Sequence, residues 1–169
     1  MTMEASAPHV LASPRRRILI GIGNEYRGDD GLGLMVAREF RRRAHPGLTV
    51  VEQNGEGTSL IAAWRGAESV LIVDAAACGD PPGTIYRFDV AQNRLPAGCC
   101  HCSSHTFGLA EAVEMARNLK ELPPKMVVYA IEGESYGQET GLSSAVVKCV
   151  SGLIRLIEDD LSTMRMSAS

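Results

Sequence analysis

Short apolar runs alternate with helical patterns along most of the chain, and this order constrains the fold more than any other feature. Five runs have the length and composition of strands: residues 17–22 (RILIGI), 48–53 (LTVVEQ), 69–75 (SVLIVDA), 83–90 (GTIYRFDV) and 125–132 (KMVVYAIE). The segments between and after them carry apolar residues three and four positions apart, the pattern of a buried helix face. Strands that alternate with helices predict an α/β domain, a three-layer α/β/α sandwich around a mostly parallel five-stranded sheet.

The predicted sheet also indicates where a functional site would lie. The strand at residues 69–75 is apolar on both faces, as a strand buried in the centre of a parallel sheet should be. We therefore expect the first and third strands to be neighbours. In open α/β sheets, ligands bind beyond the carboxyl ends of the strands. The candidate positions are residues 24–30, Asp74, the loop that ends at His105, and residues 132–134.

The composition is that of an ordinary globular domain. The chain has 169 residues, of which 45% are hydrophobic, so one domain can bury a core. Its net charge of −3 creates no field that would draw it to nucleic acid or to an anionic membrane. The N-terminal positive charges follow a weak apolar patch, the reverse of a secretory signal, which predicts a cytoplasmic protein. We expect a disordered tail at 1–14, a single domain at 15–162, and a C-terminal tail at 163–169.

A glycine-rich corner, GIGNEYRGDDG at residues 21–31, joins the first strand to a helical pattern. Such corners often bind phosphate, and the dinucleotide fingerprint is G-x-G-x-x-G. Here Tyr26 stands in place of the third glycine. Asp29 and Asp30 take the helix N-terminus, whose free amides would otherwise attract an anion. Carboxylates at this position repel phosphate, so the corner does not suit a Rossmann cofactor.

Two patterns resemble nucleophile sites without meeting the requirements of those sites. The segment GESYG at residues 133–137 matches G-x-S-x-G, but all four histidines precede Ser135, and an α/β-hydrolase needs its histidine after the serine. Cys99, Cys100 and Cys102 lie in CCHC, which lacks the paired spacing of a zinc site. A cysteine nucleophile and a histidine close to it in sequence also seldom have the geometry of a catalytic triad. Five cysteines in a chain without an export signal do not suggest disulfides. We interpret these thiols as part of a flexible loop.

An acidic corner with one histidine remains. Asp30 follows the first strand, Asp74 ends the third, and His105 opens the helical segment SHTFGLAEAV. Two carboxylates and an imidazole at one sheet edge would suit a borderline divalent cation such as nickel or zinc. Each residue also has a structural interpretation. Asp29 or Asp30 could cap the first helix, Asp74 could shape the turn after its strand, and His105 could be an ordinary first-turn residue.

Four segments, taken together and in order, resemble the hydrogenase maturation endopeptidases. They are GIGNEYRGDDGLG (21–33), VDAAACGDPPGTIYRF (73–88), SSHTFGLAEAV (103–113) and IEGESYGQETGLSSAV (131–146). The resemblance extends from about residue 16 to residue 157. It implies a phosphorylase/hydrolase-like α/β/α fold and a protease that cleaves a short C-terminal extension from the precursor of a [NiFe]-hydrogenase large subunit. Cleavage would follow the insertion of nickel into that precursor.

The resemblance also implies the roles of particular residues. In the family, a carboxylate in the first segment, an aspartate after the third strand and a histidine contact the metal. Carried over to this sequence, these residues are Asp30, Asp74 and His105, and Asn24 and Asp29 would support them. The resemblance further implies that nickel is supplied by the substrate and is not a tightly bound resident ion. The implied partner is the large-subunit precursor.

Several alternatives stay open at this point. His101 competes with His105, although His105 has the better spacing to the following helix, and no role is assigned to residues 132–142. Nickel could polarise the scissile carbonyl, activate water or serve recognition alone, while Asp30 or Asp74 handles the proton as in a carboxylate-based (aspartic-type) endopeptidase. The rival functions are a self-sufficient metallohydrolase of a small molecule, with its own zinc or manganese, and a non-catalytic nickel-binding chaperone.

Overall fold

A five-stranded sheet forms the centre of the computed structural model, which describes residues 16–96 and 107–166. The strands lie in the order β2-β1-β3-β5-β4. Their bounds are β1 (Arg17–Ile22), β2 (Leu48–Gln53), β3 (Ser69–Ala76), β4 (Ile85–Asp89) and β5 (Lys125–Glu132). β1 pairs in parallel with both β2 and β3, β3 pairs in parallel with β5, and β4 runs antiparallel to β5. The predicted sheet is confirmed, including the neighbouring positions of the first and third strands.

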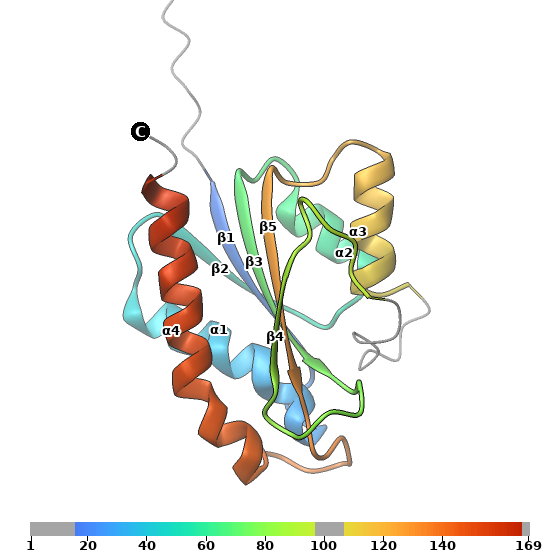
Figure 1. The fold of residues 1–169 in the computed structure, drawn as a ribbon, viewed down its shortest axis with the longest axis vertical. Coiled ribbons are helices and arrows are strands. Elements are labelled where there is room, and N and C mark those ends of the chain that lie inside the picture. The colour runs from blue at the N-terminus through green and yellow to red at the C-terminus, as the bar shows by residue number, and fades with distance from the viewer. Residues whose placement is uncertain (1–15, 97–106, 167–169) are drawn as a thin grey trace, which may run out of the picture.

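Helices cover both faces of this sheet, as Figure 1 shows. α1 (Leu32–Arg43) and α4 (Ser144–Met166) lie on one face, and α2 (Gly57–Trp64) and α3 (Leu109–Asn118) lie on the other. The three-layer α/β/α sandwich is therefore confirmed. In residues 16–96 and 107–166, none of the helices combines the length and hydrophobicity that crossing a bilayer would require.

Each sheet face has its own apolar core, because successive side chains of a strand point to opposite faces. In β1, Leu19 packs into the core beneath α1 and α4, whereas Ile18 and Ile20 pack beneath α2 and α3. The core beneath α1 and α4 contains the buried rings of Phe40 and Tyr129. The core beneath α2 and α3 contains the buried ring of Trp64. The two cores fix both the register of the strands and the edge at which their carboxyl ends meet.

The last strand in sheet order, β4, runs antiparallel to the others because the connection between β3 and β4 is short. Only residues 77–84 connect β3 to β4, and they include the turn GDPPG. A parallel crossover needs a dozen or more residues. The connection therefore turns back, and β4 pairs antiparallel with β5 at the edge of the sheet.

α4 continues to Met166, because Leu161 is buried and Met164 still packs on the core. One helix start differs from the start that the sequence predicts. α3 begins at Leu109 and not at His105. The amide of Gly108 donates to the Glu111 carboxylate at 3.1 Å, which caps the helix at this later position.

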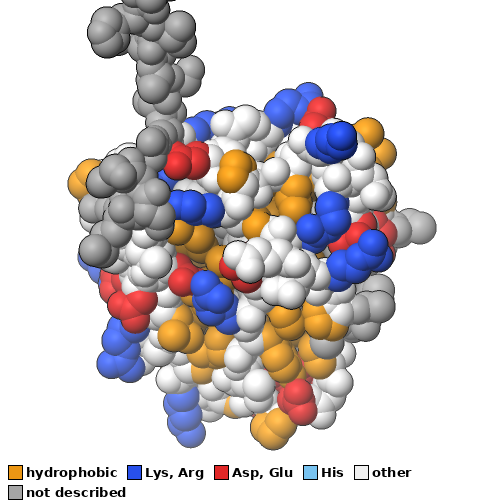
Figure 2. Space-filling view, turned by 45° about the horizontal axis from the view of Figure 1, so that its top comes forward, with side chains coloured by type: hydrophobic (Ala, Val, Ile, Leu, Met, Phe, Trp, Pro, Cys, Tyr) orange, Lys and Arg blue, Asp and Glu red, His pale blue; other side chains and the backbone are white. Residues whose placement is uncertain are grey.

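The surface carries charges of both signs. On the face that Figure 2 shows, Lys and Arg side chains are interspersed with Asp and Glu, and hydrophobic side chains gather between them. This mixture agrees with the small net charge of −3.

Candidate active site

The carboxyl ends of β1 and β3 meet at one edge of the sheet, and each leads to an aspartate. Asp74 lies in β3, two residues before the strand ends. Asp30 lies in a short 3₁₀ helix, η1 (Gly28–Gly31), which connects β1 to α1 and was not predicted from the sequence. The parallel register places Gly21 of β1 opposite Val73, the residue before Asp74. The two aspartates thus lie at the same end of the sheet, as predicted.

The glycines of the corner serve close packing of the backbone. A Cβ on Gly33 would lie 2.1 Å from the carbonyl oxygen of Ile22 and 2.5 Å from that of Val73. Gly23 has a φ of +151°, and a Cβ there would lie 1.8 Å from the Asp30 carbonyl oxygen. Side chains at these positions would push η1 and α1 away from the sheet. The glycine-rich pattern therefore reflects the approach of η1 and α1 to β1 and β3, which brings Asp30 to Asp74.

Asp30 and Asp74 are both buried, with 5% and 3% of their surfaces exposed. Burial, together with the nearby Asp30 carboxylate, raises the pKa of Asp74 to about 7, although the amide of Ala75 donates to its Oδ1 at 2.9 Å. Burial also raises the pKa of Asp30, against the opposing effects of the Arg27 guanidinium and the Asn24 amide. The site therefore holds two carboxyl groups that disfavour being ionised together.

Asp29, the neighbour of Asp30, has a different task. Its side chain is fully buried, and its carboxylate accepts hydrogen bonds from the amides of Glu134 at 2.7 Å, Ser135 at 3.1 Å and Ser143 at 2.7 Å. Burial alone would raise the pKa of Asp29, but these three amides outweigh burial and hold the pKa below its ordinary value. Asp29 therefore anchors the loop between β5 and α4 as an ionised group.

Backbone contacts fasten the same loop to the corner. The amide of Gly28 donates to the Glu139 carbonyl at 2.8 Å, and the amide of Asp29 donates to the Ser135 carbonyl at 2.9 Å. Residues 132–142, to which the sequence assigned no role, thus form one wall of the site. The Ser135 hydroxyl donates a hydrogen bond to the Glu139 carboxylate within this wall.

Asn24 shapes the turn before η1. Its Oδ1 accepts from the amide of Tyr26 at 3.0 Å, and its own amide donates to the Asp30 carbonyl at 3.2 Å. This arrangement is an Asx turn, in which the side chain takes the place of a backbone acceptor. The supporting position proposed for Asn24 is compatible with these contacts.

Glu132 and Tyr136 stabilise the backbone near the site, a role that the sequence analysis did not assign to either residue. Glu132 is buried, and its carboxylate accepts from the amides of Cys78 and Gly79, each at 2.9 Å. It therefore holds the connection after β3. The Tyr136 hydroxyl donates to the Ala76 carbonyl and accepts from the Gly133 amide. The acidic residue at the carboxyl end of β5 could have suggested the role of Glu132. Its hydrogen-bond partners, however, are more than 50 positions away in the sequence.

His105, His101 and the cysteines of CCHC lie outside the described residues. The chain re-enters the described part at Phe107, whose ring lies where a Cβ on Gly57 would be, at the start of α2. Within the described ranges there is no group of three or more His, Cys, Asp or Glu side chains that could hold a metal ion. Asp30 and Asp74 are brought together there, and the third predicted ligand, His105, stays a prediction.

An open cleft of about 690 Å³ lies beside the corner. One side is formed by the turn before η1, with Tyr26 68% exposed, and the other by the loop that Asp29 anchors. Its lining residues are Asn24, Tyr26, Arg27, Gln138, Glu139 and Thr140. The cleft is large enough to accept a segment of polypeptide beside the turn that leads to Asp30.

Comparison with known proteins identifies the family. The family model described as hydrogenase maturation protease (HycI) matches residues 34–160, about three quarters of the chain. The chain belongs to this family. The protein FrxA from Pyrococcus furiosus is 30% identical over 134 residues, which cover 77% of this chain and 93% of FrxA.

Other relatives are longer than this chain. The hydrogenase expression/formation protein HupD from Thiocapsa roseopersicina is 24% identical over 117 residues, 68% of this chain and 53% of HupD. HoxM from Cupriavidus necator, described in the same words, is 26% identical over 133 residues, 78% of this chain and 66% of HoxM. The chain thus spans about half of HupD and just under two thirds of HoxM.

Solved structures of hydrogenase maturation proteases share the fold. The hydrogenase maturating endopeptidase HybD from Escherichia coli superposes with a TM-score of 0.71 at 21% identity, over 90% of this chain and 93% of HybD. The [NiFe]-hydrogenase maturation protease HycI from Thermococcus kodakarensis gives 0.64 at 23% identity, over 90% of this chain and 96% of HycI. At this identity the likeness establishes the three-layer architecture.

Proposed function

We propose that this protein is an endopeptidase that removes a C-terminal extension from the nickel-loaded precursor of a [NiFe]-hydrogenase large subunit. Family membership supports the general activity. One observation carries the metal-dependent part of the proposal: burial raises the pKa of both Asp30 and Asp74, and the Asp30 carboxylate raises that of Asp74 further. A divalent cation removes the cost of ionising them, because its charge favours the ionised form of both carboxyl groups.

Nickel is, in this proposal, part of the substrate. Carboxylate and imidazole groups are suitable ligands for it, so Asp30 and Asp74 would bind it together with His105. Three protein ligands leave further coordination positions for groups of the precursor or for water. A precursor without nickel would meet two mutually repelling carboxyl groups and would be bound less well. Metal recognition would thereby delay cleavage until the precursor is loaded.

The protein's own residues also suit peptide hydrolysis. Burial raises the pKa of Asp74 to about 7 in the metal-free protein, and a bound cation would lower that pKa. In the nickel-loaded complex Asp74 would therefore be ionised and could accept a proton from attacking water and return it to the leaving amine. Burial is the main cause of the raised pKa of Asp74, and the neighbouring Asp30 carboxylate adds to it. A bound divalent cation contributes polarisation of a carbonyl group or of water. The cleft between the turn before η1 and the loop after β5 would hold the precursor segment on either side of the scissile bond.

Mass spectrometry of the precursor before and after incubation tests this function. The nickel-loaded precursor should lose its C-terminal extension when the protein is added. A precursor that binds the protein but keeps its extension would favour a nickel-binding chaperone. A stoichiometric metal that survives dialysis of the protein alone would favour a self-sufficient metallohydrolase. The cytoplasmic location inferred from the N-terminal sequence stays a prediction.

A further inference from the structure

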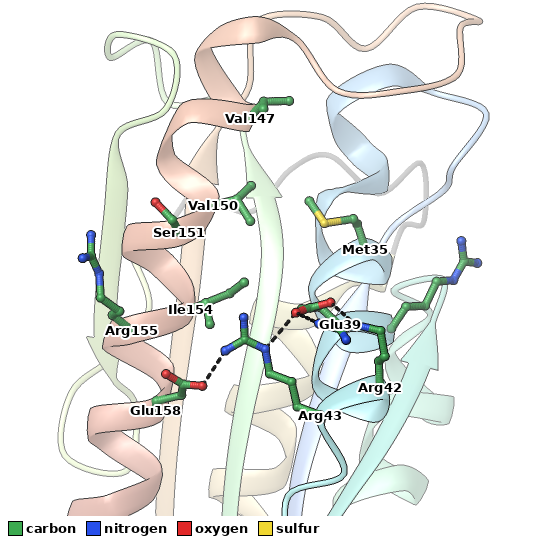
Figure 3. Close-up of a pocket in the computed structure, with 11 residues that line it drawn as sticks. Met35, Glu39, Arg42, Arg43, Val147, Val150, Ser151, Ile154, Arg155 and Glu158 are labelled. Carbon is green, nitrogen blue, oxygen red and sulfur yellow. Dashed lines mark hydrogen bonds and ion pairs between the residues drawn. The ribbon is translucent and has the colours of Figure 1, made fainter.

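A groove of about 720 Å³ runs between α1 and α4, on the face of the sheet that these two helices cover (Figure 3). Its floor is apolar and consists of Met35, Val147, Val150 and Ile154. Val147 is 55% exposed, which is a large exposure for an apolar side chain that lines a concave surface. Exposed apolar surface with a polar rim is typical of a protein interaction site.

Arginine side chains dominate the rim of this groove. Arg38, Arg42, Arg43 and Arg155 line it, against only two acidic side chains, Glu39 and Glu158. Arg38 also pairs with Glu25 at 2.9 Å and with Glu52 at 3.0 Å, both outside the groove, so among the described residues Arg155 is the arginine of the groove that has no ion-pair partner. A cation without an ion-pair partner beside an apolar floor favours a partner that carries an acidic residue next to apolar ones.

Ion pairs occupy the other arginines of the groove, and Arg42 pairs with Glu39 at 2.8 Å. Arg43 donates to Glu39 of its own helix at 2.8 Å and to Glu158 of α4 at 2.7 Å, so it links the two helices (Figure 3). Arg155 is exposed and makes no ion pair with any described residue. A carboxylate of a bound partner could therefore pair with Arg155 without displacing an internal partner.

The two helices that form the groove start directly after two segments of the candidate active site. α1 starts directly after η1, which carries Asp30, and α4 starts directly after the loop that Asp29 anchors. Met35 and Val147 lie in the first turns of α1 and α4, so the apolar end of the groove is the end nearer the site.

We propose that this groove is a docking surface for a segment of the hydrogenase precursor that carries apolar side chains flanked by Asp or Glu. The proposal rests on the function proposed above and adds to it a contact remote from the cleaved bond. The apolar side chains of the segment would cover Val147 and Val150, and its carboxylates would pair with Arg155. Binding here would add affinity for the folded precursor without contributing to the chemistry at Asp30 and Asp74.

The affinity of the nickel-loaded precursor tests this surface directly. Biolayer interferometry would measure the dissociation constant with the parent protein and with Val147→Asp and Arg155→Glu. We expect Val147→Asp to weaken binding at least tenfold, because it places a carboxylate on the apolar floor. Arg155→Glu should weaken binding at least threefold and make it less sensitive to salt. Mass spectrometry of the same samples reports cleavage separately.

Matched controls lie on the opposite face of the sheet, at the end of α3. Leu119 is 57% exposed, close to the 55% of Val147, and Lys120 is an exposed cation beside it. Leu119→Asp and Lys120→Glu should leave the dissociation constant within twofold of the parent value. Thermal unfolding of all four variants should match that of the parent, because the substituted side chains are exposed.

The outcomes separate this surface from the catalytic function. Unchanged affinity in both groove variants would overturn the docking proposal, while cleavage by the parent protein would leave the proposed function standing. Weakened affinity in the groove variants alone would support the docking surface even if no cleavage were seen. A dimer in light scattering that Val147→Asp converts to a monomer, with unchanged affinity for the precursor, would overturn it in favour of self-association.

Discussion

Replacing Asp74 by asparagine should stabilise the metal-free protein while abolishing its activity. Asp74 is 3% exposed, and the pKa of its carboxyl group is about 7, against an ordinary value of 3.8. The folded state therefore binds this proton more tightly than the unfolded state does. The stability of the parent protein falls as pH rises from about 4 to about 7, where Asp74 becomes ionised in the folded state.

The size of this effect follows from the difference between the two pKa values. Each pKa unit corresponds to 1.36 kcal/mol, so ionised Asp74 costs at most about 4 kcal/mol of folding free energy above pH 7. Asparagine has nearly the same shape, can accept from the Ala75 amide, and carries no charge to ionise. We expect the free energy of unfolding of the variant to exceed that of the parent by roughly 1 to 4 kcal/mol at pH 8. At pH 4 the two free energies should be nearly equal.

Urea denaturation in the presence of a chelator, at pH 4, 6 and 8, measures this difference. Asp159→Asn, at an exposed position of α4, is the matched control and should follow the parent at every pH. The same preparations would be assayed for loss of the precursor's extension, which Asp74→Asn should no longer catalyse. An Asp74→Asn variant less stable than the parent at pH 8, or one that still processes the precursor, would refute this reasoning.

Three further substitutions test other parts of the site. Asp29→Asn should cost about 1–3 kcal/mol of stability at pH 7 and speed hydrogen exchange of the three amides that bond to Asp29. Because folding lowers the pKa of Asp29, its contribution to the free energy of unfolding is present above pH 3.8 and is lost as pH falls further. Unchanged hydrogen exchange of the three amides in Asp29→Asn would exclude the anchoring role. His105→Ala should abolish processing with thermal unfolding unchanged, and full activity would exclude His105 as a ligand. Replacing Cys99, Cys100 and Cys102 together by serine should leave processing intact, and loss of cleavage in a folded variant would indicate a thiol mechanism.

The layered fold could be predicted because its determinants are local. The bounds of β1 and β5 agree with the apolar runs 17–22 and 125–132, since a buried parallel strand leaves a continuous apolar signal. The placement of Asp30 and Asp74 at one edge followed from the rule that parallel strands end at the same edge. The predicted start of α3 at His105 was wrong. The helix begins at Leu109, where the Glu111 carboxylate accepts from the Gly108 amide and caps it.

The division of labour between the adjacent aspartates could not be predicted from the sequence. Asp29 bonds to amides 105 to 114 positions away, and no local pattern identifies the loop that will cover it. The same holds for Glu132, whose acceptor role depends on where the chain passes after β3. Sequence patterns thus locate the carboxylates at this edge, whereas tertiary packing decides which of them anchors a loop and which faces Asp74.

Processing of matched precursors with and without nickel tests the central claim most directly. The purified protein would be incubated with each precursor under the same conditions, and mass spectrometry would follow the mass of the large subunit over time. The account predicts loss of the C-terminal extension from the nickel-loaded precursor and an intact metal-free precursor. Equal cleavage of both precursors would contradict the claim that Asp30 and Asp74 recognise nickel in the substrate.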